Sequence, residues 1–252
     1  SDKEEDPIDK EIGFMKALIR MRMPDYAQKC LDKLIQKNPD AKARASGIKI
    51  DILAGVGKYA EAEQMIASLP LDTLETWVMK MSLAEHYYEA GKMTEAKAGY
   101  NAFFKKYQNG PPAGMDKFYM EQAYRYAQML MFKNEEKEAV EAFRCVLLGK
   151  PPKDVEFKIR MDLAELCVKL AEKTKDKERN DFFVKAREAC EPVLWKDPGG
   201  PLFGKALMIL AHVELIKGDK VAAKKLIATN MPMLKELEKV IIENKISLDF
   251  SP

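Results

Sequence analysis

Histidine, tryptophan and cysteine are scarce in this sequence of 252 residues, which has two histidines, two tryptophans and four cysteines. His86 and His212 lie far apart, and no C-x-x-C or H-E-x-x-H pattern accompanies them, so the sequence offers little from which to build a metal site. The cysteines are too few and too widely spaced for a disulfide framework. We expect a small buried apolar residue at each of the four: Cys30, Cys145, Cys167 and Cys190.

Sequence patterns typical of enzymes are missing as well. The Gly-rich and Pro-rich segments 109–114 and 197–201 lack the lysine and the serine or threonine of a phosphate-binding loop. No G-x-S-x-G pattern occurs, and the carboxylates are scattered along helices instead of being paired in a dry pocket. We therefore expect a protein that is not an enzyme and that uses no cofactor and no metal.

Neither sign of charge dominates, and long apolar runs are absent. Lys and Arg number 42 against 40 Asp and Glu, a formal net charge of +2, which gives no overall field that would attract nucleic acid. No run approaches the roughly 18 apolar residues that a membrane span needs. Glycine and proline, 13 of each, are too few for an all-β chain, while good helix formers dominate. These features predict an all-α fold.

Residues 80–107, KMSLAEHYYEAGKMTEAKAGYNAFFKKY, show how the helices are organised. Two short apolar stripes at helical spacing lie on either side of Gly91: Leu83, Ala84 and Tyr87 before it, then Ala96, Tyr100 and Phe103 after it. The pattern L-A-x-x-Y-x-x-x-G-x-x-x-x-A-x-x-x-Y-x-x-F resembles the tetratricopeptide repeat, a helix-turn-helix unit of about 34 residues.

The same unit recurs along the chain. The small residue that opens its second helix appears at intervals close to the repeat length, at Ala27, Ala62, Ala96, Ala139, Ala186 and Ala223. We expect a single domain over residues 1–252, a right-handed superhelical solenoid of about six helix-turn-helix units. The expected units span roughly 8–39, 40–70, 72–110, 116–151, 153–198 and 201–230.

The sequence departs from the repeat pattern at two places. The charged run between the helices of the fifth unit is about ten residues longer than the repeat requires, and we expect it to extend both helices. Glu214 stands where the family usually has an aromatic residue. A final helix over residues 232–246 is expected to cap the solenoid.

The resemblance also implies where a partner would bind. In this family the first helices line a concave groove, and positions two, five, nine, twelve and thirteen of the unit usually face it. The residues of this sequence expected there are Met81, Glu85, Tyr88, Tyr124, Gln128, Met131, Phe132, Met161 and Met208. Methionine and tyrosine adapt well to apolar partners. The same residues at helical spacing are also typical of a core, so their exposure is the point to test.

These residues predict a non-catalytic scaffold or adaptor that holds an extended or amphipathic apolar polypeptide segment. Asp51 and Glu85 lie where chaperone-binding relatives carry basic residues, so they would repel a terminal carboxylate. The alternative is a structural module that associates with a second copy of itself. A helical-repeat RNA binder is a third hypothesis, and the acids in the groove count against it.

A second resemblance bears on the cellular location of the protein. The third unit, with its A-x-x-Y-Y-x-x-G start and FFKKY end, is similar to units of exported bacterial proteins of envelope assembly. Together with a first residue that is Ser1 and not methionine, this favours a bacterial periplasmic or envelope-associated protein over a cytoplasmic one.

Overall fold

The structure is a computed structural model that describes residues 6–39, 41, 45–70, 73–111 and 113–230. The described residues form helices and turns and no strand, so the prediction of an all-α chain built from helical hairpins is confirmed. The chain divides into two compact units, Ser1–Tyr107 and Gln108–Pro252. The expected capping helix, residues 232–246, lies outside the described residues.

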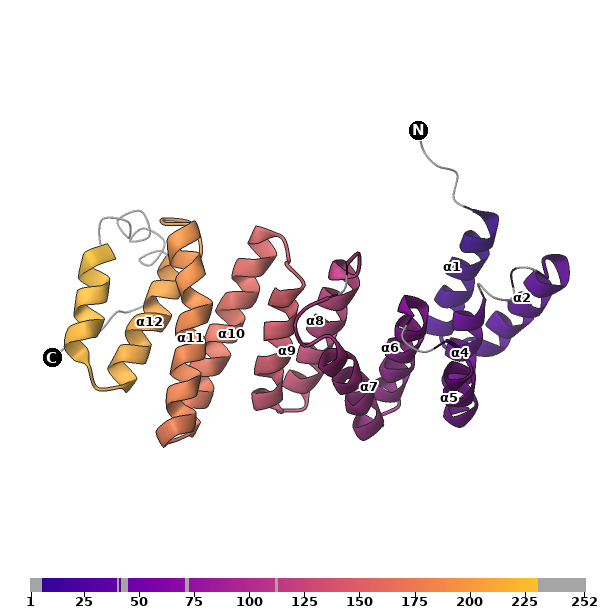
Figure 1. Cartoon of the computed structure of the whole chain (residues 1–252), viewed down its shortest axis with the longest axis horizontal. Helices are drawn as coiled ribbons and strands as arrows, with labels where there is room; N and C mark the ends of the chain where they lie inside the picture. The colour runs from indigo at the N-terminus through magenta and orange to yellow at the C-terminus, as the bar shows by residue number, and fades with distance from the viewer. Residues whose placement is uncertain (1–5, 40, 42–44, 71–72, 112, 231–252) are drawn as a thin grey trace. The chain divides into compact units, whose positions relative to one another are not determined.

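Unit 1 contains three helix pairs (Figure 1). Their helices are α1 Pro7–Arg20 with α2 Pro24–Lys37, α4 Ser46–Gly55 with α5 Tyr59–Ala67, and α6 Leu74–Glu89 with α7 Met93–Lys106. Helix α4 packs against α1, α2, α5 and α6. Its sequence explains this central place, because Ile48, Ile50 and Ile52 are all buried and a helix that is apolar on several faces needs neighbours on each of them.

Unit 2 repeats this arrangement with longer helices. Its helices are α8 Asp116–Phe132 with α9 Glu136–Leu148, α10 Lys153–Lys173 with α11 Asp176–Lys196, and α12 Phe203–Ile216, which precedes a helical segment over 220–230. Helices α8 to α12 lie side by side in chain order, and each contacts the next (Figure 1).

In five of the hairpins, all except α10–α11, one residue in the turn has a left-handed backbone. It stands five positions before the small residue of the second helix, with φ between 59° and 86°, at Arg22, Gly57, Gly91, Asn134 and Gly218. In every case the next residue donates its backbone N–H to the carbonyl five positions earlier, at 2.8–2.9 Å, as Lys92 does to Tyr87. This bond satisfies a carbonyl at the end of the first helix and reverses the chain within a few residues.

The expected small residues of the second helices are all buried in the core. Ala27, Ala62, Ala96, Ala139 and Ala186 have no exposed surface, and Ala223 is almost fully covered. A methyl group at this point lets the two helices of a pair approach closely. Cys167 and Cys190 are also buried, whereas Cys30 and Cys145 are half-buried, and none of the four is in a disulfide.

The extra residues of the fifth unit lengthen both of its helices, as expected. Helices α10 and α11 have 21 residues each, and only Thr174 and Lys175 separate them. Charges of these helices pair with α9: Lys173 with Glu136 at 2.9 Å, and Lys137 with Glu178 at 2.6 Å. The charged run therefore lies on helices of unit 2 and pairs with a neighbouring helix.

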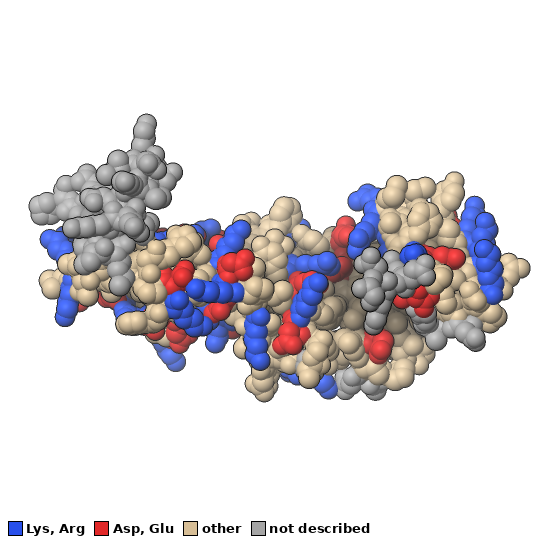
Figure 2. All heavy atoms as spheres, turned by 90° about the horizontal axis from the view of Figure 1, so that it is seen from above, with Lys and Arg blue, Asp and Glu red and all other residues tan. Residues whose placement is uncertain are grey.

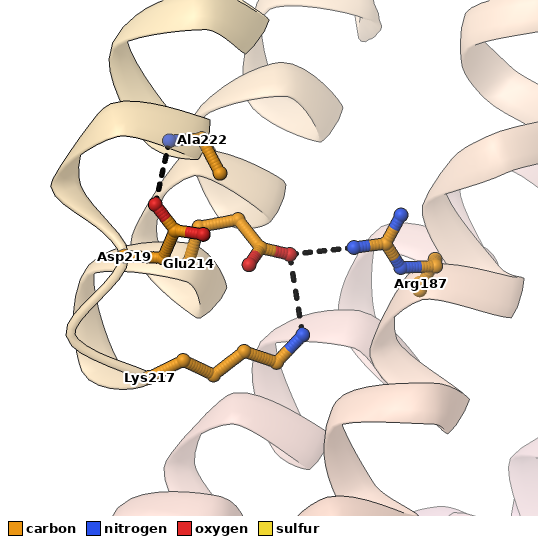
Figure 3. A network of polar contacts seen from close by, with 5 residues as sticks. All are labelled: Arg187, Glu214, Lys217, Asp219 and Ala222. Carbon is orange, nitrogen blue, oxygen red and sulfur yellow. Dashed lines mark hydrogen bonds and ion pairs between the residues drawn. The ribbon is translucent and has the colours of Figure 1, made fainter.

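Glu214 of α12 is buried beside α11 and pairs with two basic side chains (Figure 3). Its Oε1 accepts hydrogen bonds from Nη2 of Arg187 at 2.5 Å and from Nζ of Lys217 at 3.2 Å. A buried carboxylate is costly unless it is paired and hydrogen-bonded. Arg187 and Lys217 thus explain how an acid can occupy a position where the repeat usually has an aromatic residue.

The close approach of α6 and α7 in unit 1 can be tested at Gly99. A Cβ at this position would lie 2.8 Å from Cβ of Ala84, which is too short for a carbon contact. Gly99→Ala should therefore lower the free energy of unfolding by about 1–3 kcal/mol through overpacking of α6 against α7. The measurement is urea denaturation followed by circular dichroism.

Gly13→Ala in α1 is the matched control, because a Cβ at this position would meet no atom within 4 Å outside the neighbouring backbone of its own helix. This change should raise the free energy of unfolding by about 0.5–1 kcal/mol, as alanine does in an exposed helix. Equal effects of the two substitutions would contradict the close contact between α6 and α7.

Candidate functional site

Helix α8 carries four of the residues expected to contact a partner. Tyr124, Gln128, Met131 and Phe132 are at i, i+4, i+7 and i+8 and therefore share one face of the helix. Phe132 is 74% exposed and Tyr124 is 37% exposed, while Gln128 is exposed and Met131 is half-buried. We call these four residues the α8 stripe.

Two of the expected groove residues are core residues instead. Met81 and Met161 are each 1% exposed, so the prediction that they face an open surface is wrong. Helix α6 lies between α4 and α7, and α10 contacts α9, α11 and α12, so neighbouring helices cover these side chains. Glu85, Tyr88 and Met208 are half-buried. Their role in binding stays a prediction.

Unit 1 contains an apolar trough that the sequence did not predict. It has a volume of about 490 Å³ and lies between the second helices α5 and α7, with α6 as its floor. Along α6 the lining residues Trp77, Lys80, Ala84 and Tyr87 stand at i, i+3, i+7 and i+10, so they follow one line about 15 Å long. The walls are Glu63, Ile66 and Ala67 of α5, and Glu95, Ala98, Gly99 and Ala102 of α7.

One end of the trough is acidic. The Tyr87 hydroxyl donates a hydrogen bond to Oε1 of Glu63 at 2.7 Å. Burial, this hydrogen bond and the negative charges of Glu63 and Glu95 together raise the pKa of Tyr87 well above its usual range. Two carboxylates from facing helices therefore flank one hydroxyl that stays protonated. Lys92 lies nearby, with its Nζ 4.6 Å from the centre of the Tyr59 ring.

The other end of the trough is aromatic and carries a cation. Trp77 is 6% exposed and packs against Phe103, with ring centres 5.5 Å apart. The Nζ atom of Lys80 lies 4.4 Å from the centre of the Trp77 ring, a cation–π contact. Among the described side chains, Trp77 is one of the few whose buried N–H has no hydrogen-bond partner.

A sequence signal for the trough exists in α7. The buried residues of this helix are Ala96, Tyr100, Phe103 and Phe104, so the small residues 98, 99 and 102 belong to a different face. Such a face usually carries charged residues, whereas here it is lined by small ones. Small residues on the outer face of a second helix can indicate a hollow beside it.

A second polar group joins α4 to α6. Oδ1 of Asp51 accepts a hydrogen bond from Oγ of Ser82 at 2.5 Å and lies 3.7 Å from Nε2 of His86. Burial lowers the pKa of His86, but the neighbouring carboxylates outweigh burial. Asp51, Glu89 and Glu85 together raise the pKa of His86 above its ordinary value. Asp51 was expected to face the groove, and it instead serves as an internal link.

The described residues show no group of three or more acids, histidines or cysteines arranged to hold a metal ion. Burial raises the pKa of the Cys167 and Cys190 thiols to about 12, so both stay protonated at neutral pH and are poor nucleophiles. On the face that Figure 2 shows, basic and acidic side chains are interspersed. Among the described helices, none combines the length and apolarity of a membrane crossing.

The link between Asp51 and His86 should make the stability of unit 1 depend on pH. Because the folded state raises the pKa of His86, its protonation stabilises the fold below about pH 6.5, and this stabilisation is lost as pH rises through the folded pKa. Between pH 5.5 and 8.5 the wild type should therefore lose more thermal stability than His86→Gln does.

Asp51→Asn is the control for this experiment, because it removes the nearest negative charge and should reduce the pH dependence in the same way. Melting temperatures of the three proteins across this pH range provide the measurement. Parallel curves for the wild type and His86→Gln would contradict the link.

Comparisons with known proteins give distant structural likenesses. No protein-family model and no curated protein matches the sequence. The crystal structure of MamA has 16% identity and a TM-score of 0.38 and covers 75% of this chain and 96% of that one. The TPR2AB domain of yeast Sti1 in complex with pHSP90 has 14% identity, a TM-score of 0.37 and 95% coverage of both chains. BtubC from P. vanneervenii has 13% identity, a TM-score of 0.38 and 93% coverage of both.

By its own helix pairs, its recurring left-handed turn and its buried small residues, the chain has a tetratricopeptide-like helical-repeat fold.

Proposed function

We propose that this protein is a non-catalytic scaffold that binds an apolar polypeptide segment through the α8 stripe. The observation that supports this proposal is the exposure of Phe132 and Tyr124 on one face of a first helix, at positions expected from the sequence to contact a partner. Large aromatic side chains that stay exposed together are typical of binding surfaces.

The chemistry of the stripe fits a segment of a polypeptide. Phe132 offers apolar area, Met131 adapts its shape to a neighbour, and Tyr124 combines an apolar ring with a polar tip. Gln128 lies between them and can both donate and accept a hydrogen bond, which an exposed backbone amide needs. An apolar helix face or an extended strand of a partner would cover the two rings and hydrogen-bond to the side-chain amide of Gln128.

Peptides selected by the wild-type protein from a random phage-displayed library provide a direct test. We expect the selected peptides to be rich in apolar residues and to bind the double variant Tyr124→Ala, Phe132→Ala at least tenfold more weakly, because both rings lose their contact area. Far-ultraviolet circular dichroism should stay unchanged, since both side chains are exposed.

The double variant Val184→Ala, Trp195→Ala is the matched control. It removes an exposed aliphatic side chain and an exposed aromatic one from α11 of the same unit, where Trp195 is 80% exposed. This variant should keep full affinity. Selected peptides that bind the α8 variant as tightly as the wild type would contradict the proposal. A wild-type dimer in light scattering that the α8 variant loses would support self-association through this surface instead.

A further inference from the structure

We propose that the trough of unit 1 is a second binding site, for a small amphiphile with an aliphatic tail and a cationic head. This inference is independent of the α8 stripe, which lies in unit 2. It depends on the shape of the trough, on the chemistry of its walls and on the opposite charges at its two ends.

The size of the trough suits an aliphatic chain. A volume of about 490 Å³ is within the range of small-molecule sites. Spread along the α6 line, about 15 Å, this volume corresponds to a cross-section of about 30 Å². Helices are about 10–12 Å wide with their side chains, so a narrow, elongated space of this kind suits an extended alkyl chain better than a helix.

The walls also disfavour a peptide backbone. Each peptide unit brings an N–H and a C=O that need hydrogen-bond partners when they are buried. Between its ends the trough presents Ile66, Ala67, Leu83, Ala84 and Ala98, whose side chains can neither donate nor accept such a bond. An alkyl chain makes no such demand and gains free energy from every methylene that it buries.

The charges give the ligand a direction. At the Tyr87 end the trough is lined by the carboxylates of Glu63 and Glu95, and Nζ of Lys92 lies 5.8 Å from the centre of the Tyr87 ring, so two acids outnumber one cation there. At the opposite end the Lys80 ammonium group lies over Trp77. A cationic head is therefore attracted to the first end and repelled from the second, which leaves the tail against the indole.

Trp77 makes the site directly observable. The chain has two tryptophans, and Trp195, the other one, is exposed on α11 of unit 2. In the Trp195→Phe protein, indole fluorescence therefore reports on the trough alone. We expect octylammonium, added below its micellar concentration, to change the Trp77 emission saturably. Octanoate, which has the same tail and the opposite charge, and butylammonium, which has a shorter tail, should each bind at least tenfold more weakly.

Three variants in the Trp195→Phe background locate the binding. Ala98→Leu with Ala102→Leu fills the trough from exposed positions of α7 and should abolish the response to octylammonium. Ala60→Leu, at an exposed position of α5 outside the lining, should leave it unchanged. Glu63→Gln with Glu95→Gln should weaken octylammonium severalfold and should bring its affinity closer to that of octanoate. Circular dichroism verifies that each variant is folded.

The following results would overturn the proposal. Octanoate that binds as tightly as octylammonium would show that the acidic end plays no part. A response that survives Ala98→Leu with Ala102→Leu would place the ligand elsewhere, and the absence of a saturable response would remove the site. A peptide of leucines ending in lysine that binds more tightly than octylammonium would assign the trough to a polypeptide partner.

Discussion

The close packing of two helices at one small residue is the constraint on which the rest of the structure depends. In each pair a fully or almost fully covered alanine sits at the contact, and in five pairs a left-handed turn residue stands five positions before it. The turn fixes where the chain reverses, and the alanine fixes how near the second helix returns. Arg22 and Asn134 adopt the left-handed conformation although they are not glycine, which has a cost of about 1–2 kcal/mol for most side chains. The pairs keep this geometry at those two positions because the packing of the whole hairpin outweighs the local strain.

Much of this fold is predictable from the sequence, because its strongest signals are local. Each hairpin has its own small residue, such as Ala62, Ala96 or Ala139, and its own turn residue, such as Gly57 or Gly91. These signals depend only on neighbouring residues of the same hairpin. The exposure of side chains on the first helices depends on the next hairpin as well, which the local pattern does not contain. Met81 and Met161 show the difference: their positions along the helix are right for a groove, and helices from adjacent pairs cover them. The trough was missed for a related reason, since it results from the spacing of α5 and α7, which belong to different hairpins.

Polar groups in this protein are used mainly to join neighbouring helices. Asp51 connects α4 to Ser82 and His86 of α6, and Glu214 connects α12 to Arg187 of α11. Both acids find their partners on an adjacent helix. A buried or half-buried carboxylate with such partners favours one register between two helices, because a shift along the axis would leave it unpaired. These acids thus add specificity to contacts that are otherwise made by interchangeable apolar side chains.

Because many charged side chains pair between neighbouring helices, fewer of them remain available to bind a partner. The acids and bases that pair across helices, such as Glu136 with Lys169 and Lys173, are neutralised within their own unit. Two surfaces of the described residues keep groups that are not used in this way: exposed aromatic area, as at Phe132, and the two carboxylates of Glu63 and Glu95 beside the trough, which outnumber the nearby Lys92. The first has no charge preference and suits an apolar polypeptide, whereas the second selects a cation. The two surfaces therefore differ in the chemistry that they can recognise, and a single partner of uniform character would not satisfy both.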